Sequence, residues 1–355
     1  MSSELSEGHI RSGKVMTVAG PISVDQMGVT LMHEHILNDC RCWWHAPKTP
    51  ERQYLAEGFV CMEILGELRQ DPFVNKHNIT LDDEPLAILE LMDFAKAGGK
   101  TVVEPTCQGI GRNPLALRRI AKASGLNIVM GAGYYLASSH PAKVAEMTVE
   151  AIADEIVHEA LVGVDGTDVK IGLIGEIGVS SDFTKEEEKS LRAAAQAQVR
   201  TGLPLMVHLP GWYRLGHKVL DIASEEGADL RHTVLCHMNP SHDDLTYQGE
   251  LASRGAFIEY DMIGMDFFYA DQQVQCPSDE DAARAIVKLV EMGHLDRILL
   301  SHDVFLKMML SRYGGNGYAY ILRHFLPRLQ RHGLSADALS TLMRGNPRSV
   351  FQAAA

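Results

Sequence analysis

The sequence predicts an α/β fold of the (β/α)₈ barrel type, and three observations lead to it. Short runs rich in β-forming residues, bounded by turn residues, recur eight times along the 355-residue chain. Stretches with helical periodicity separate these runs, and strict alternation of strands and helices indicates a parallel sheet. The eight units occupy roughly 270 residues, close to the roughly 250 residues of a (β/α)₈ core. A doubly wound sheet is the alternative.

The expected strands follow one another at regular intervals. They are Val29–Asn38, Lys100–Cys107, Asn127–Tyr135, Lys170–Val179, Pro204–Leu209, Thr233–Met238, Ala256–Met262 and Arg297–Val304. The expected helices between them include Pro114–Ser124, Pro141–Val162, Lys185–Gly202, Gly216–Glu226, Asp279–Met292 and Gly317–Arg331. Glycine often closes a helix just before the next strand, as at Gly125 and Gly202, which is typical of helix C-termini.

Two segments are expected to decorate the barrel. Lys14–Val24 contains Ala19-Gly20-Pro21 at its centre and predicts an N-terminal hairpin. Ala46–Glu90 is a long excursion between the first two strands, with helix expected over Glu57–Gln70. A long insertion at this place can act as a lid over the barrel mouth. No linker or low-complexity tract divides the chain, so residues 1–355 are expected to form a single domain.

Composition excludes several classes of protein. The chain is 46% apolar and carries a net charge of −13 without a basic run, so no nucleic-acid partner is expected. No apolar stretch reaches the roughly 18 residues that span a bilayer, so no membrane partner is expected either. The segment Met1–Arg11 is polar and does not have the pattern of a secretory signal. The six cysteines are sparse and form no Cys-x-x-Cys pair, which favours a reduced cytoplasmic protein.

The first expected strand leads into the sequence His33-Glu34-His35. Residues i and i+2 of a strand point to the same face and lie about 7 Å apart along the chain. The two imidazoles can therefore converge on one metal ion. This motif alone is weak, because two polar residues at the end of a strand are also common.

Four further strands end in residues of the metal-ligand type. Strand four has Glu176 near its carboxyl end, strand five has His208, strand six has His237, and strand eight finishes with Ser301-His302-Asp303. The carboxyl ends of all barrel strands meet at one rim, where barrel active sites lie. Buried charges at these positions are costly unless they are paired or bound to metal. The sequence therefore predicts one metal centre at this rim, with a polar cluster without metal as the alternative.

The predicted ligands are His33, His35, Glu176, His208, His237 and Asp303. Imidazole and carboxylate without thiolate suit Zn, and also Co, Ni, Mn or Fe. Six ligands are too many for one tetrahedral ion but fit two ions that share a bridging carboxylate. Glu176 is the expected bridge, because strand four lies between the two histidine pairs around the barrel. Two such ions polarise a carbonyl or phosphoryl oxygen and supply hydroxide at neutral pH.

Aromatic and polar residues after the strand ends predict a substrate pocket with a few polar anchors. The predicted substrate contacts are Tyr135, Trp212, Arg214, Tyr260 and Asp261. Arg214 is expected either to hold an anionic substrate group or to form a surface ion pair. Further candidates near the rim are Trp43, Trp44, His45, Tyr134, Tyr213, Asp266, Phe267, Phe305 and Lys307, and His302 is a candidate partner of the metal ligands.

Nearly the whole chain resembles the phosphotriesterase family of the amidohydrolase superfamily. The motifs that carry the resemblance are Gly20-Pro21, His33-Glu34-His35, Ile110-Gly111-Arg112-Asn113, Gly175-Glu176-Ile177-Gly178, His208, His237, Asp261, Ser301-His302-Asp303 and Asn346-Pro347. The resemblance implies that His33 and His35 bind a buried metal ion together with Asp303. It also implies that His208 and His237 bind a second, more exposed ion.

One departure from the family pattern concerns the bridge between the ions. Phosphotriesterase itself uses a carboxylated lysine, whereas this sequence has Glu176. Lys170 lies six residues earlier on the same strand face, about 20 Å away, and cannot substitute. A glutamate here resembles the phosphotriesterase-related branch, which includes resiniferatoxin-binding proteins. Phosphotriester hydrolysis is therefore expected only as a weak side activity.

The resulting hypothesis is a binuclear metal-dependent hydrolase with a small-molecule substrate. Metal-bound hydroxide would attack a lactone, a carboxylic ester or an N-acyl amide, and Asp303 would act as the catalytic proton acceptor. The alternative from another class is a ligand-binding protein that keeps the metal site and has little catalysis. A metal-bearing lyase or isomerase would have the same ligands. A homodimer is kept as a further alternative for the assembly.

Overall fold

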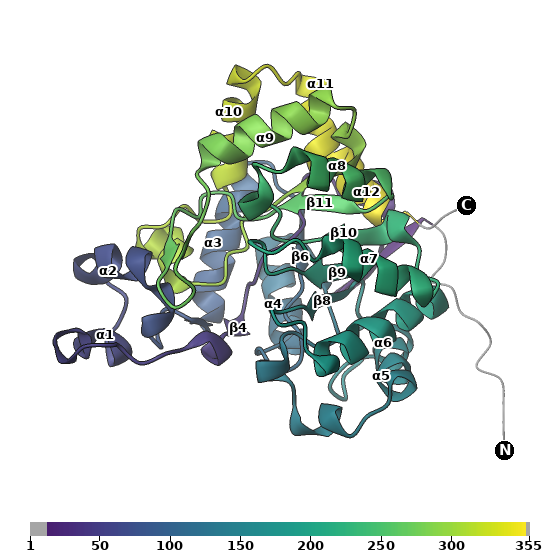
Figure 1. Cartoon of the computed structure of the whole chain (residues 1–355), viewed down its shortest axis with the longest axis horizontal. Helices are drawn as coiled ribbons and strands as arrows, with labels where there is room; N and C mark the ends of the chain where they lie inside the picture. The colour runs from purple at the N-terminus through teal and green to yellow at the C-terminus, as the bar shows by residue number, and fades with distance from the viewer. Residues whose placement is uncertain (1–12, 353–355) are drawn as a thin grey trace.

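The computed structural model describes residues 13–352, so the polar segment Met1–Arg11 lies outside the described residues. Eight parallel strands form the centre of the molecule and helices surround them (Figure 1). The barrel strands are β3 (Thr30–Leu31), β6 (Thr101–Glu104), β7 (Asn127–Met130), β8 (Ile174–Gly178), β9 (Leu205–His208), β10 (Thr233–Leu235), β11 (Phe257–Tyr260) and β14 (Ile298–Leu300). The predicted (β/α)₈ barrel is confirmed. Each strand is shorter than expected at one or both of its ends.

Backbone hydrogen bonds beyond these short strands close the barrel. Regular pairing gives two groups, β3-β6-β7 and β8-β9-β10-β11-β14. Between β7 and β8, the N–H of Gly172 donates to the carbonyl of Met130 at 3.0 Å. Between β14 and β3, Asp303 donates to the carbonyl of His33, and His35 donates to that of Val304, both at 3.1 Å. The first and last strands of the barrel therefore meet beside the predicted ligands.

A helical segment follows each barrel strand. These segments are α3 (Glu84–Lys96), α4 (Pro114–Ser124), α5 (Val149–Leu161), α6 (Lys185–Thr201), α7 (Gly216–Glu225), α8 (Leu245–Ser253), α9 (Asp279–Glu291) and α10 (Leu326–Arg331), the last preceded by a π-turn at Ile321–Phe325; α11 (Ala336–Ser340) and α12 (Asn346–Phe351) end the chain. The expected helix over Pro141–Val162 begins only at Val149, because Thr148 caps it and a 3₁₀ turn precedes it.

The N-terminal hairpin forms as predicted, from β1 (Lys14–Thr17) and β2 (Gly20–Ser23) in antiparallel pairing. Val15 and Val24 pack into the cluster of side chains that fills the barrel interior. Arg118 of α4 donates to the carbonyl of Val18 at 2.9 Å. The hairpin therefore covers the amino-terminal end of the barrel and leaves the opposite rim open.

The insertion after the first strand differs in detail from the expectation. Its helix is interrupted: α1 (Tyr54–Glu57) ends at Gly58, whose backbone is extended, and α2 (Leu65–Gln70) follows a 3₁₀ turn. The insertion also ends before Glu90, because α3 already begins at Glu84. β4 (Asn38–Asp39) and β5 (Thr80–Leu81) pair antiparallel and join its two ends. In Figure 1, α1 and α2 stand apart from α5, α6 and α7.

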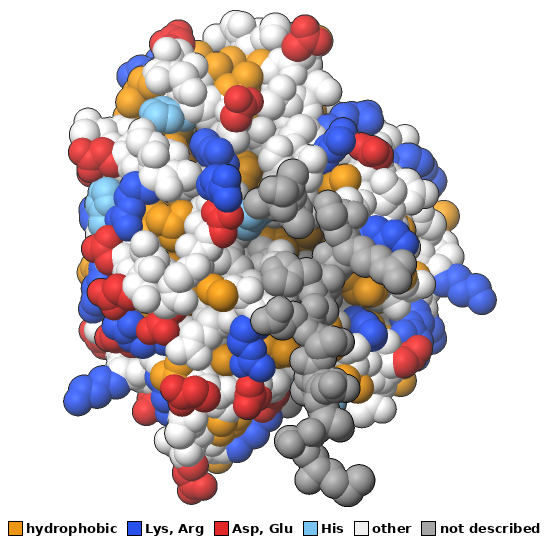
Figure 2. All heavy atoms as spheres, turned by 90° about the vertical axis from the view of Figure 1, so that its right-hand side faces the viewer, with side chains coloured by type: hydrophobic (Ala, Val, Ile, Leu, Met, Phe, Trp, Pro, Cys, Tyr) orange, Lys and Arg blue, Asp and Glu red, His pale blue; other side chains and the backbone are white. Residues whose placement is uncertain are grey.

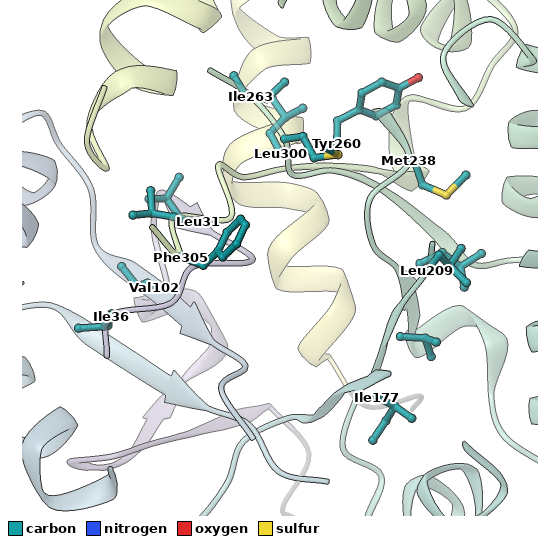
Figure 3. Close-up of a cluster of buried hydrophobic side chains, with 14 of the residues drawn as sticks. Leu31, Ile36, Val102, Ile177, Leu209, Met238, Tyr260, Ile263, Leu300 and Phe305 are labelled. Atoms are coloured by element: carbon teal, nitrogen blue, oxygen red, sulfur yellow. The ribbon is translucent and has the colours of Figure 1, made fainter. Parts of the chain in front are cut away.

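Alternation along the strands divides the core into two layers. Met206 of β9 and Leu299 of β14 point into the barrel, whereas their neighbours Leu205 and Leu300 face the helices. Figure 3 shows part of the outer layer, with Leu31, Val102, Ile177 and Leu300 contributed by four different strands. This alternation decides which residues near the strand ends can reach the site.

The surface carries charges of both signs. In Figure 2, Lys and Arg side chains are interspersed with Asp and Glu over the visible described residues. Within residues 13–352, no helix has the length and apolar character needed to cross a bilayer. All six cysteines carry free thiols.

Candidate metal centre and its pocket

The two histidines after β3 face two carboxylates from other strands. The Nε2 atom of His33 lies 3.5 Å from Oε2 of Glu176 and 3.6 Å from Oδ1 of Asp303. The Nε2 atom of His35 lies 3.3 Å from both Oε1 of Glu176 and Oδ1 of Asp303. Four side chains from three strands thus converge on one point at the carboxyl end of the barrel.

A second group of predicted ligands shares Glu176. Nδ1 of His208 lies 3.2 Å from Oε2 of Glu176, and Nε2 of His237 lies 3.7 Å from the same oxygen. The two imidazole nitrogens are themselves 2.7 Å apart. Glu176 therefore lies between the two histidine pairs, with Oε1 toward His35 and Oε2 toward His33, His208 and His237.

The donor set fits divalent metal ions. The Nε2 atom of His33 is buried and lacks a hydrogen-bond partner, a costly state for a polar group in the core. Ligands about 2.0–2.2 Å from a tetrahedral Zn ion are separated from one another by about 3.3–3.6 Å. The distances between His33, His35, Glu176 and Asp303 lie in this range. These ligand atoms form two overlapping buried groups, both containing His33.

Opposite charges dominate the electrostatics of the centre. Burial opposes a charged imidazole, but Asp303 and Glu176 outweigh it and raise the pKa of His35 to about 9. Burial likewise opposes charge on His237, whose pKa Asp261 raises to about 10. Burial would raise the pKa of Glu176, yet the imidazoles, His33 first, hold it well below its usual range. The carboxylates therefore attract positive charge to this point, as protons on imidazole or as metal ions.

Asp261 connects the two groups of ligands from behind. Its carboxylate accepts from the backbone N–H of His237 at 2.9 Å, and it lies 3.0 Å from Nδ1 of the same residue. Oδ2 of the same carboxylate, which accepts from the His237 backbone, also lies 3.3 Å from Nδ1 of His33. Asp261 is fully buried, so it orients one histidine of each pair and leaves their Nε2 atoms facing Glu176.

A second chain of contacts orients His35. Its Nδ1 atom lies 2.7 Å from the hydroxyl of Thr106, which in turn donates to Glu104. All three residues are buried. Glu259, two residues before Asp261, adds a carboxylate 3.6 Å from Nδ1 of His33. These partners were not identified from the sequence, although Glu259 and Asp261 share a strand face by their i, i+2 spacing.

Glu34 fixes the segment that carries Asp303. Its carboxylate accepts from the hydroxyl of Ser301 at 2.8 Å and from the backbone N–H groups of His302 and Val304 at 2.9 Å each. It also lies 2.6 Å from Nδ1 of His302, whose Nε2 accepts from the N–H of Ile321. His302 is therefore held between strand and helix and does not contact the ligands.

Two of the ligands adopt strained backbone conformations. His237 has φ +59° and Asp303 has φ +51°, values that non-glycine residues rarely adopt. Such strain persists only where surrounding contacts determine the conformation, and it gathers at functional sites. Here the contacts are those of Asp261 with His237 and of Glu34 with the residues flanking Asp303.

A cavity of about 500 Å³ opens directly above the ligands. Aromatic residues from five of the segments that follow the barrel strands line its wall: Trp43, Phe73, Tyr135, Trp212, Tyr269 and Phe305. His35, Glu176, His208, His237 and Asp303 form its floor. The ligands and the predicted pocket thus belong to one site.

The predicted substrate contacts divide into two groups. Tyr135 and Trp212 line the cavity, as expected. Tyr260 does not: it is buried on the outer face of β11, where its hydroxyl donates to Gln248 at 2.6 Å. Adjacent strand residues point to opposite faces, so Tyr260 and Asp261 could not both face inward. Asp261 faces inward but binds ligand histidines from below, outside the cavity lining.

Arg214 and several other candidates either line the cavity or form ion pairs outside it. Arg214 lies outside the cavity lining and pairs with Asp243 and Asp244, the surface ion pair given as its alternative. Trp43, Tyr213 and Phe305 line the cavity, whereas Lys307 pairs with Asp82. Phe73 and Tyr269 were not predicted, because the insertion and the hairpin of β12 (Phe268–Tyr269) and β13 (Val274–Gln275) bring them to the rim.

The barrel and the site together define a metal-dependent hydrolase. The family model of the phosphotriesterase family matches residues 13–351, and the chain belongs to this family. An N-acetyltaurine hydrolase from Danio rerio is 38% identical over 339 residues, covering 95% of this chain and 97% of the relative.

Two solved structures extend the comparison. A resiniferatoxin-binding protein from Rhodobacter sphaeroides is 70% identical, with a TM-score of 0.97 over 99% of both chains. A lactonase from Listeria monocytogenes is 26% identical, with a TM-score of 0.78 over 96% of this chain and 100% of the other. Both the resemblance and the branch predicted from the sequence are confirmed.

Proposed function

We propose that this protein is a binuclear metal-dependent hydrolase of lactones, carboxylic esters or N-acyl amides. The observation that carries the proposal is the position of Glu176, which lies within 3.7 Å of both histidine pairs, with Oε2 next to members of each pair. Zinc is the expected metal, with Co, Mn, Ni or Fe as substitutes. When bound, two such ions would supply a hydroxide nucleophile at neutral pH and polarise the carbonyl of the substrate.

Asp303 is suited to accept and return a proton. Its side chain is 11% exposed, on the side of the cavity, and Oδ1 lies 3.3 Å from Nε2 of His35. As the nucleophilic oxygen forms its bond to the carbonyl carbon, its proton passes to Asp303. The proton then moves to the leaving oxygen or nitrogen while the C–O or C–N bond breaks.

Tyr135 is suited to position the carbonyl group. The indole N–H of Trp43 donates to the Tyr135 hydroxyl at 3.3 Å, which leaves the proton of that hydroxyl free to donate into the cavity. Burial raises the pKa of Tyr135 well above its usual value, so the hydroxyl stays protonated. Its ring lies against His208, with centroids 4.8 Å apart, and so stands beside the metal centre.

The activities of two relatives support hydrolysis at a carbonyl centre. The Danio rerio relative is a hydrolase of an N-acyl amide, and the Listeria monocytogenes relative is a lactonase. Both reactions break an acyl bond to a heteroatom. Phosphotriester cleavage is proposed only as a weak side activity.

Ligand binding without turnover is the second candidate. One observation favours it: the 70% identical relative is a resiniferatoxin-binding protein. The intact ligand set argues for catalysis, because binding alone requires no activated water.

A hydrolysis screen separates the two candidates. Protein reconstituted with Zn, Co or Mn is offered δ-decanolactone, 4-nitrophenyl hexanoate, N-acetyltaurine and a dialkyl 4-nitrophenyl phosphate. We expect turnover of at least one carbonyl substrate, lost after chelation and in Glu176→Gln. Binding of the lactone without turnover of any of the four compounds would favour the ligand-binding function.

A further inference from the structure

One side of the cavity wall is a cluster of aromatic rings in contact with one another. Phe73 lies at its centre, with its ring 5.5 Å from Trp43 in a stacked arrangement, 5.0 Å from Tyr269 and 6.2 Å from Phe305. Trp212 continues the wall, 5.8 Å from Tyr269. A substrate above the metal centre therefore has an apolar aromatic surface against which it can pack.

The lining residues, all within the described part of the chain, include no lysine or arginine. Apart from the residues of the metal centre, the one carboxylate in the wall is that of Glu187. Both its oxygens are already occupied: Oε1 accepts from the N–H of Ala137 at 3.1 Å, and Oε2 from Thr184 at 2.9 Å and from the hydroxyl of Ser180 at 2.8 Å. Glu187 therefore holds the loops of the wall and does not anchor a substrate.

Cys42 in the wall is uncharged, and the nearby arginines lie outside the cavity lining. Burial raises the pKa of the Cys42 thiol to about 11, so it is neutral near pH 7. Two arginines in loops after the strands, Arg41 and Arg214, are held by acidic neighbours, Asp39 for the first and Asp244 for the second. The wall thus offers an anionic substrate group no cation with which to pair.

We infer that the substrate of this enzyme is uncharged and carries a bulky apolar group, and that the pocket rejects anionic substrates. The inference rests on the proposed hydrolase function and narrows its substrate class. N-acetyltaurine, the substrate named for the Danio rerio relative, carries a sulfonate, which is anionic at neutral pH. Burying such a group without a partner is costly. This chain is therefore expected to differ from that relative in its substrate.

The size of the effect follows from burial. An unpaired charge in a closed site lowers kcat/KM by about 100-fold or more relative to an uncharged substrate of the same shape. Each methylene buried against the aromatic wall raises kcat/KM by about fourfold. Chain length and charge should therefore act in opposite directions on the same scaffold.

Two esters of equal length test whether the pocket rejects a negatively charged substrate. 4-Nitrophenyl hexanoate and the mono-4-nitrophenyl ester of adipic acid differ in a terminal methyl against a terminal carboxylate. With metal-reconstituted protein, we expect kcat/KM to be about 100-fold higher for the hexanoate. N-acetyltaurine should be a poorer substrate than N-acetylbutylamine, which lacks the sulfonate.

A charge introduced at the rim provides a matched pair of variants. Gln272 is an exposed residue of the cavity lining. Gln272→Arg should narrow the gap between the two esters by about tenfold, because it supplies the missing cation. Gln272→Met has a similar volume without charge and should keep the parental ratio.

The outcomes distinguish this inference from the proposed function. Equal kcat/KM for the two esters, or preferred turnover of N-acetyltaurine, would overturn the inference and leave the hydrolase function intact. If no carbonyl substrate is cleaved, the hydrolase function fails. The binding of uncharged and anionic ligands then tests whether the pocket rejects negative charge. Trp43 and Trp212 line the cavity and are two of the three tryptophans, so their fluorescence reports occupancy. Quenching by methyl hexanoate alone supports the inference, whereas equal quenching by monomethyl adipate overturns it.

Discussion

The two ends of the barrel use the same strands for opposite purposes. At the amino-terminal end, inward-facing residues such as Met206, Val234 and Leu299 are apolar and fully buried beneath the hairpin. A few residues further along the same strands, the inward-facing positions carry His208 and Asp303. Residues that stabilise the barrel and residues of the site therefore occupy different ends of the same strands. Variants at one end should change stability, and variants at the other end should change activity.

Glu176→Gln should have the largest effect on activity. A neutral amide cannot balance two dications, so we expect metal content to fall from about two ions per chain to less than one. Hydrolysis should become undetectable. Elemental analysis beside circular dichroism would check this, with Glu188→Gln on the outer surface of α6 as the control. A variant that retains both ions and its activity would show that Glu176 is not the bridge.

Asp303→Asn should have the next largest effect, because the amide keeps a ligand oxygen but cannot accept a proton. We expect kcat to fall by about 10²–10⁴-fold with a smaller loss of metal. Metal content, kcat and KM would be measured on the same preparation. Near-parental kcat with full metal content would assign the proton transfer to another group.

Asp261→Asn should lower the affinity for both metal ions, because Asp261 contacts one histidine of each pair. Loss of such an outer contact typically reduces metal affinity by about 10–100-fold. Competition with a chelator gives the two affinities. A loss confined to one ion would contradict the shared role of this carboxylate.

Leu299→Ala at the closed end should leave catalysis almost unchanged. Leu299 is fully buried inside the barrel. Its truncation should lower the free energy of unfolding by about 2–5 kcal/mol, as for other large-to-small core changes. Denaturant unfolding and kcat per folded molecule would be compared with those of the parent. A fall in kcat as large as that of Asp303→Asn would show that the two ends are not separate.

The sequence predicted the barrel and the convergence of its ligands because both depend on local patterns. An apolar run ending in His208 or Glu176 marks the carboxyl end of a strand, and barrel geometry brings those ends together. The binding of metal at this point stays a prediction. Positions within each strand were predicted less well, since Tyr260 was placed in the pocket although strand alternation turns it outward.

The parts of the site that depend on distant contacts could not be predicted. Phe73 reaches the pocket through the insertion and Tyr269 through a hairpin, and neither position follows from a local pattern. The role of Glu34 was missed for a similar reason: its partners lie 267 or more residues away in sequence. Only the closed barrel shows that the middle residue of His33-Glu34-His35 holds the last strand.

The seam held by Glu34 also sets the order of events during synthesis of the chain. His33 and Ser301, which meet across this seam, are separated by 268 residues. At about 5–20 residues per second, the ribosome needs roughly 15–50 s to pass from one to the other. Throughout that interval the early ligands exist without Asp303 and without a closed barrel around them. The complete set of predicted ligands can therefore assemble only after the last barrel strand has been made and has paired with the first.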